Sequence, residues 1–268
     1  MIRVIVSGCL GKMGSRVVAR MKGREDMELV AGIEAPGCLA LGQDVGEALN
    51  LGWMGGKVST DLVQVIELCD VLVEFTNPAT TLEHLRLAQR YKKRAVVGTT
   101  GLSEDEKREA WMLSTNLPMV VAPNLSLGVN LLFRLAEEAA RALGRDYDIE
   151  IVEAHHRAKQ DAPSGSAKRL GEILCEVRGW KYEDAVTSGR TGRSEGRRPD
   201  ELAILSLRAG DVVGEHTLVF AGDGERLELT HRATSRDPFA RGAVEAIKFV
   251  AQAKPGMYDM LDVLGLKK

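Results

Sequence analysis

The residues of this chain most suited to chemistry lie in segment 153–166, where ionisable side chains follow one another closely. His155 and His156 are adjacent, and three further ionisable residues, including Lys159, precede a proline. Imidazole titrates near neutral pH and can donate or accept a proton, while a lysine can anchor an anion or donate a proton. Clustered cations of this kind predict a binding site for a dicarboxylate beside a proton donor.

The same segment ends in Pro163-Ser164-Gly165-Ser166, a pattern typical of a helix start, where N–H groups and hydroxyls can hold a carboxylate. A solvated loop with a helix cap at Ser164 or Ser166 would show the same pattern. A metal site is an alternative for the two histidines, but no obvious third ligand stands nearby, so no metal is predicted.

Elsewhere, His216 and His231 fall on expected strands, which favours a structural role for both.

A second candidate site begins near the N-terminus, where three glycines follow the first apolar run with the spacing G-x-x-G-x-x-G. Glycines let backbone N–H groups approach a pyrophosphate, and a helix N-terminus adds unpaired donors with a favourable dipole. A tight turn packed without a ligand would have the same spacing, and Lys12 either adds a cation or is merely exposed. The turn residues expected to contact a dinucleotide are Gly8, Cys9, Leu10, Gly11, Lys12 and Met13.

Further polar or small residues follow the other strands expected in this half of the chain. Glu34 ends the second strand, where an acid can accept hydrogen bonds from ribose hydroxyls, although a solvated strand-end charge would look the same. Ligands of open α/β sheets bind at the carboxyl ends of the strands. The other expected cofactor contacts there are Phe75, Thr76, Gly98, Thr99, Thr100, Ala122, Pro123, Asn124 and Leu125.

The elements that must position these residues change character near residue 126. In the first half of the chain, short β-branched runs alternate with segments of helical spacing, which predicts a Rossmann-like parallel sheet with helices on both faces. The expected strands are 4–7, 28–33, 71–74, 94–97 and 118–121, and the expected helices are 12–22, 60–68, 79–91, 103–115 and 127–142.

The second half predicts an α+β domain with a mostly antiparallel sheet. A strand at 148–154 precedes a loop at 155–165 and a helix at 166–178, and 187–199 is expected to be a long surface loop. Turns at 210–211 and 222–224 would join hairpin strands, and a last helix is bounded by two prolines. The strands are 202–208, 213–220 and 226–232, and the last helix is 239–253.

Composition narrows the class of function. A net charge of −2 provides no global field that would recruit nucleic acid or an anionic membrane. Apolar stretches fall short of the roughly 20 residues that a membrane helix needs, and the N-terminus has too short an apolar run for a signal peptide. Four scattered cysteines predict reduced thiols, so a cytoplasmic protein is expected.

The chain resembles the dihydrodipicolinate reductases. Residues 153–166 match the family pattern E-x-H-H-x-x-K-x-D-A-P-S-G-[TS]-A, with Ser166 where many relatives have threonine. The resemblance covers essentially the whole chain in the family's order. It extends through 8–14, 75–78, 98–101, 190–193, 208–216, 224–229 and 231–236.

The resemblance implies an NADH- or NADPH-dependent reductase of lysine and diaminopimelate synthesis, which reduces the cyclic imine formed when 4-hydroxy-tetrahydrodipicolinate loses water. His155 would be the acid/base histidine and Lys159 the proton-donating lysine, while His156, Gly165 and Ser166 would bind the substrate carboxylates. Family members are typically homotetramers assembled through the sheet of the second domain. The dinucleotide-binding domain would be 1–126 with 237–268, and the substrate-binding and tetramerisation domain 127–236.

One residue bears on the cofactor preference, and two other functions would share part of these sequence features. Ala35 stands where NADP-competent relatives often have arginine, so NADH is expected to serve at least as well as NADPH. Another two-domain nicotinamide oxidoreductase would share the glycine turn but would not explain the His-His-x-x-Lys segment. A catalytically silent nucleotide sensor would tolerate the loss of His155 and Lys159, and both residues are present.

Overall fold

The structure is a computed structural model that describes residues 1–193 and 196–267. The chain forms two compact units, one of Met1–Leu127 with Asp237–Lys268 and one of Gly128–Arg236. The sequence predicted the change of domain between residues 126 and 127, and the structure places it one residue later. Residues 194–195, within the expected surface loop 187–199, lie outside the described part.

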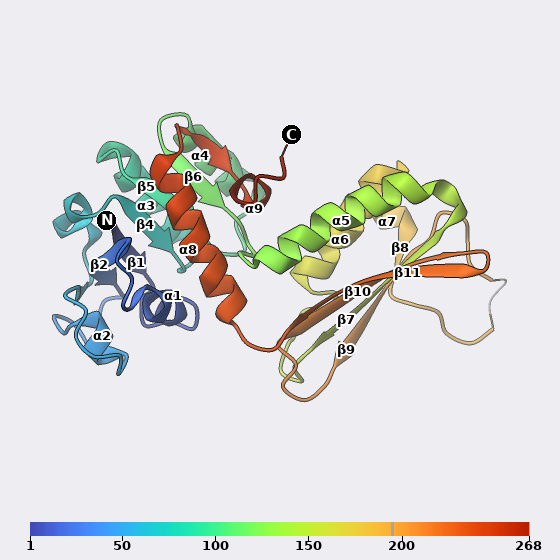
Figure 1. Cartoon of the computed structure of the whole chain (residues 1–268), viewed down its shortest axis with the longest axis horizontal. Helices are drawn as coiled ribbons and strands as arrows, with labels where there is room; N and C mark the ends of the chain where they lie inside the picture. Colours follow the sequence, from blue (N-terminus) through green and yellow to red (C-terminus); the bar gives the residue numbers. More distant parts are fainter. Residues whose placement is uncertain (194–195, 268) are drawn as a thin grey trace. The chain divides into compact units, whose positions relative to one another are not determined.

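The first unit is built on a parallel sheet of seven strands in the order β12-β6-β5-β4-β1-β2-β3 (Figure 1). The strand order runs outward in both directions from the neighbouring β1 and β4, so the carboxyl ends of these two strands form the switch point at which such sheets bind ligands. The strands are β1 Ile2–Ser7, β2 Met27–Ile33, β3 Lys57–Ser59, β4 Val71–Glu74, β5 Arg94–Val97, β6 Pro118–Val121 and β12 Gly256–Tyr258.

Helices cover both faces of this sheet because its strands are apolar on both sides. Val4 and Val6 of β1 pack in one core with α1 and α8, whereas Ile5 between them packs in a second core with α3 and α4. A parallel sheet buried on both faces is the expected result. The helices of this unit are α1 Gly14–Met21, α2 Val45–Ala48, α3 Pro78–Arg90, α4 Glu104–Ser114, α8 Asp237–Gln252 and α9 Met260–Val263.

The second unit has a five-stranded mixed sheet in the order β11-β10-β7-β9-β8. Its β7–β10 and β10–β11 ladders are antiparallel and its β7–β9 and β8–β9 ladders are parallel. Long helices α5 and α6 lie over one face, where Leu132 and Leu170 pack with Ile151 and Phe220 (Figure 1). The elements are β7 Asp148–His155, β8 Val186–Thr187, β9 Leu202–Arg208, β10 Gly214–Gly222, β11 Glu225–Ala233, α5 Leu127–Leu143, α6 Gly165–Arg178 and α7 Tyr182–Ala185.

Two predictions of local structure outside the candidate site were wrong. Segment 60–68 is not one helix but two 3-10 turns, Leu62–Gln64 and Ile66–Leu68, separated at Val65. Four β-branched residues in segment 60–68 disfavour a continuous helix, and the side chain of Asp61 caps only the first turn. The turn at 210–211 does not join a hairpin, because β9 pairs in parallel with β7, whose other edge pairs with β10.

Within the described residues, no helix has both the length and the apolar character needed to span a bilayer.

Candidate active site

The glycine turn after β1 is shaped to bring main chain close to a ligand. Gly8 has a φ of +71°, and a Cβ there would lie 2.5 Å from the carbonyl oxygen of Phe75. Only glycine fits this position without moving the end of β4. The turn leads directly into α1, whose N-terminus has no side-chain cap and no acidic residue in its first turn.

Glu34 at the end of β2 is attached to this turn. Its Oε1 accepts the N–H of Leu10 at 2.6 Å, so the carboxylate is held beside the turn. Ala35 is exposed and adds no charge next to it. Cys9 is fully buried, and burial raises the pKa of its thiol to about 12, so only the main chain of Cys9 is suited to contact a ligand.

The ends of β4 and β5 are joined by a buried polar network. The N–H of Thr76 donates to Oγ1 of Thr99 at 3.1 Å, and Oγ1 of Thr76 donates to Oε2 of Glu74 at 3.0 Å. Glu74 is fully buried, and its Oε1 lies 2.7 Å from Nδ1 of His84 on α3. Ser7 at the end of β1 lies 3.3 Å from the same nitrogen, so three strand ends share one network.

The remaining expected cofactor contacts lie at the same edge of the sheet. Oδ1 of Asn124 accepts the N–H of Ser126 at 2.9 Å, and the N–H of Gly98 donates to the carbonyl of Glu74 at 2.9 Å. Gly11, Lys12, Thr100 and Pro123 are exposed, Met13 and Phe75 are half-buried, and Ala122 and Leu125 are buried.

These residues fit a dinucleotide. The uncapped start of α1 and the close glycine backbone suit a pyrophosphate, and the Glu34 carboxylate suits a ribose diol. The first unit therefore contains the expected binding groups on five neighbouring strand ends.

The second unit holds the His–Lys segment, and it begins within the sheet. His155 is the last residue of β7 rather than part of the following loop, and only 9% of it is exposed. Its Nδ1 lies 2.5 Å from Oε2 of Glu153, two residues earlier on the same face of the strand. Burial lowers the pKa of His155, and the hydrogen bond that its ring donates to Glu153 offsets only part of that effect.

Arg208 of β9 binds both carboxylate oxygens of Glu153. Its Nη1 and Nη2 donate to Oε2 and Oε1 of Glu153 at 2.9 and 2.8 Å, a two-pronged arrangement that arginine favours. Oε1 also accepts the N–H of Ser164 at 3.1 Å. Ser164 caps α6 through its hydroxyl, which accepts the N–H of Ala167 at 3.2 Å.

His216 of β10 completes this cluster. Its ring lies edge-on to that of His155, with 5.4 Å between ring centres, and its Nε2 is 3.0 Å from Oγ of Ser164. Burial lowers the pKa of His216 to about 4, so its ring is neutral at physiological pH. A neutral ring avoids a second positive charge beside His155.

The cations and the helix start lie after β7. Both carboxylate oxygens of Asp161 accept hydrogen bonds from Nζ of Lys159, at 2.7 and 2.9 Å. The charge of Lys159 contributes to the lowered pKa of His155, so the two groups act on each other. His156 is half-buried, Gly165 is the exposed first residue of α6, and Ser166 is partly buried.

Sequence reasoning gave no role to Glu153 or Arg208, and it predicted only a structural role for His216. The alternation of apolar residues along β7 did indicate where the side chain of Glu153 would point. Ile149 and Ile151 face the core, and the period of two places Glu153 and His155 on the same face. Arg208 and His216 are 55 and 52 residues from the groups they bind, so no local spacing could reveal them.

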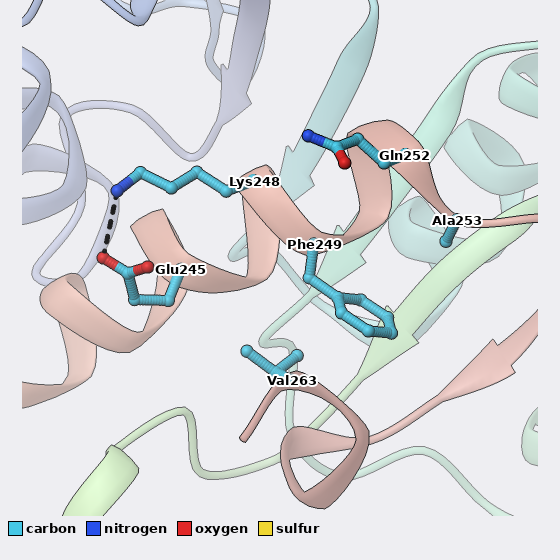
Figure 2. Close-up of a pocket in the computed structure, with 6 residues that line it drawn as sticks. All are labelled: Glu245, Lys248, Phe249, Gln252, Ala253 and Val263. Carbon is cyan, nitrogen blue, oxygen red and sulfur yellow. Dashed lines mark hydrogen bonds and ion pairs between the residues drawn. The ribbon is translucent and has the colours of Figure 1, made fainter. Parts of the chain in front are cut away.

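A hollow in the first unit lies between α8 and α9 and contains none of these candidate residues (Figure 2). Its one acid, Glu245, pairs with Lys248 at 3.3 Å, and Lys248 also pairs with Asp26. The volume is about 460 Å³, and the charges that line it are already paired. The lining residues are Glu245, Lys248, Phe249, Gln252, Ala253 and Val263.

Comparison with known proteins decides the family. The family described as dihydrodipicolinate reductase, N-terminus, matches residues 2–125, and dihydrodipicolinate reductase, C-terminus, matches residues 128–264. The chain belongs to the dihydrodipicolinate reductase family. It is therefore an oxidoreductase with a Rossmann-type domain.

Relatives in this family match from end to end. The 4-hydroxy-tetrahydrodipicolinate reductase of Citrifermentans bemidjiense is 45% identical over 267 residues and that of Geobacter sp. strain M21 is 44% identical, with both chains fully covered in each case. A dipicolinate-bound dihydrodipicolinate reductase from Paenisporosarcina sp. TG-14 has a similar structure, with a TM-score of 0.78 and 28% identity over 98% of each chain. The reductase resemblance inferred from the sequence is thus confirmed.

Proposed function

We propose that this chain reduces 4-hydroxy-tetrahydrodipicolinate to tetrahydrodipicolinate, with loss of water, in lysine and diaminopimelate synthesis. The observation that carries the proposal is the end-to-end similarity to reductases named for that substrate. A nicotinamide dinucleotide is the cofactor, and when bound it supplies the hydride.

We infer that the chain's own residues bind the substrate and move its protons. His156, Gly165 and Ser166 are proposed to bind the two carboxylates, with the start of α6 adding N–H donors. His155 and Lys159 are proposed to stabilise the negative charge that develops on the ring and to supply the proton. Their arrangement around one end of β7 supports this assignment.

The lowered pKa of His155 fits a histidine that is neutral in the free protein and gains a proton when the substrate binds. In the free protein, burial and two neighbouring cations, Lys159 and Arg208, disfavour the protonated ring. A bound dicarboxylate brings two negative charges that favour protonation. The imidazole is therefore expected to become a proton donor when substrate arrives.

NADH is proposed to serve at least as well as NADPH. Glu34 is fixed beside the glycine turn and suits free ribose hydroxyls, whereas it would repel a 2′-phosphate. The exposed Ala35 provides no cation to compensate for that repulsion.

Homotetramer assembly through the second unit is also proposed. The face of its sheet opposite α5 and α6 carries the exposed side chains of Leu205 and Leu207 on β9, which are 39% and 55% exposed. Exposed leucines on a sheet face are typical of an interaction surface. The proposal assigns the dinucleotide to residues 1–126 with 237–268 and assigns substrate and assembly to 127–236.

The proposal further places the enzyme in the cytoplasm, where reducing conditions suit its four free thiols, Cys9, Cys38, Cys69 and Cys175.

The deciding experiment follows the oxidation of NADH and NADPH with freshly prepared 4-hydroxy-tetrahydrodipicolinate. Wild type should turn over, and His155→Ala and Lys159→Ala should each lower kcat/KM by at least ~100-fold, the scale of a lost acid/base group. Lys168→Ala removes an exposed lysine from α6 and should have little effect. A wild type that binds cofactor but never oxidises it with this substrate would disprove the proposal.

A further inference from the structure

Glu153 is a buried acid for which the proposed chemistry has no role. Its side chain is fully buried, yet it contacts two parts of the candidate site. Oε2 lies 2.5 Å from Nδ1 of His155, and Oε1 accepts the N–H of Ser164 at 3.1 Å. One carboxylate therefore touches the acid/base imidazole and also the cap of the helix whose first residues are proposed to hold the substrate.

We propose that Glu153 is a positioning residue that sets the tautomer of His155 and fixes the start of α6 relative to that ring. The inference rests on the role proposed above for His155. An ionised carboxylate only accepts hydrogen bonds, so Nδ1 must carry the proton and Nε2 is left to face the substrate. Gly214 on β10 leaves room at that nitrogen, because a Cβ there would lie 3.0 Å from Nε2.

This positioning role requires that Glu153 stay ionised, and the hydrogen bonds from Arg208 favour its ionised form. Burial by itself would raise the pKa of Glu153, but hydrogen bonds from Arg208, Ser206, His155 and Ser164 outweigh it and lower the pKa to about 2. A protonated Glu153 could donate as well as accept, and the tautomer of His155 would no longer be determined. Arg208 thus supports the positioning of His155 by keeping Glu153 ionised.

The charges around His155 give the sign of the expected effect. Glu153 on the same strand raises the pKa of the ring, whereas Lys159 after β7 and Arg208 on β9 lower it. His216 on β10 faces the ring but is neutral, because burial lowers its pKa to about 4. Removing the charge of Glu153 leaves the two cations unopposed, so the pKa of His155 must fall.

The test compares Glu153→Gln with Glu150→Gln. Glu150 lies on the same strand and is also bound by arginines, Arg190 at 2.8 Å and Arg197 at 3.2 Å, but it points to the other face. Glu153→Gln should lower kcat at least ~10-fold and shift the pKa of His155 down by about 1–2 units, the size of effect that one nearby opposite charge has. Glu150→Gln should leave that pKa in place.

Two readouts separate positioning from mere stability. The pH profile of kcat/KM reports the pKa in the free enzyme, and ¹⁵N NMR of the imidazole reports which nitrogen holds the proton. Wild type and Glu150→Gln should show protonated Nδ1, and Glu153→Gln should show a mixture of tautomers. In a His155→Gln background, Glu153→Gln should lower kcat far less than it does in the wild type.

Three results would overturn the inference. The first is an equal loss of kcat with and without His155, because Glu153 would then act on the fold alone. The second is an unchanged tautomer and pKa in Glu153→Gln. The third is full turnover by His155→Gln, which refutes the role proposed for His155 before Glu153 is altered. If Glu153→Gln does not fold, Glu153→Asp keeps the charge but shortens its reach, and it should alter the tautomer with a smaller pKa shift.

Discussion

Residue 35, which directly follows Glu34 at the end of β2, is an alanine and not a cation, and this one residue leads to a prediction about cofactor choice. Ala35→Arg would put a guanidinium where it can bind a 2′-phosphate, and a hydrogen bond to a charged group contributes about 1.5–3 kcal/mol. The ratio of kcat/KM for NADPH to that for NADH should therefore rise at least ~10-fold. Steady-state kinetics with both cofactors measures it.

Ala35→Gln is the matched control, because it adds a long polar side chain without a charge. It should change the ratio much less than the arginine does. A wild type that already prefers NADPH strongly would contradict the idea that Glu34 and Ala35 set the preference.

At the scale of residues, the sequence revealed groups that cluster along the chain. The glycine turn, Glu34 and the His–Lys segment were found because their types recur at short spacing. Glu74 and His84 were not singled out, since an acid in a buried strand and a histidine in a helix have no local pattern that joins them. Their contact forms only when α3 packs against the end of β4.

At the scale of elements, the Glu74–His84 pair joins β4 to α3 and makes the stability of the first unit depend on pH. Burial raises the pKa of Glu74. Burial also acts to lower the pKa of His84, but the hydrogen bond and charge of Glu74 outweigh it, so that pKa is raised as well. Both groups therefore hold protons more tightly in the folded chain than in the unfolded one.

When a group has a higher pKa in the folded chain than in the unfolded chain, its protonated form stabilises the fold. This stabilisation is fully present at a pH below the pKa in the unfolded chain, and it is lost as the pH rises through the pKa in the folded chain. For His84 that loss begins near the unfolded value of about 6.5. The wild type should thus lose free energy of unfolding above about pH 6.5, relative to the double variant Glu74→Gln/His84→Gln. Urea unfolding at several pH values measures the difference, and parallel pH dependences would contradict the prediction.

The elements best predicted from the sequence were buried strands and long helices. The strands β4, β5 and β6 have the expected bounds, because strands buried in a parallel sheet give continuous apolar runs. Strand β9 also has the expected bounds, although its Leu205 and Leu207 are exposed. The three-residue strands β3 and β12 and the four-residue helices α2 and α9 went unnoticed, since so few residues show no period. The pairing of β9 with β7 was missed because a glycine turn looks the same whether or not a hairpin follows.

At the scale of the whole molecule, the exposed leucines of β9 predict how the chain assembles. Leu207→Asp places a charge on the uncovered sheet face and should disrupt a tetramer, because an unpaired charge is costly to bury. Light scattering during size-exclusion chromatography gives the mass. Met112→Asp on α4 is a control of nearly equal exposure, 53% against 55%, and should leave the mass unchanged. A wild-type monomer would contradict the proposed assembly.

The return of the chain to its first unit has a consequence for its synthesis on the ribosome. Residues 1–127 emerge first, but their core lacks α8, whose Ala243 and Ile247 are fully buried in it. The second unit is continuous in sequence, so it can complete its core while the earlier unit still waits for its last helix. During that interval the apolar face of β1 and α1 is exposed to other chains. We therefore expect nascent chains that stop before residue 237 to depend on chaperones more than the finished enzyme does.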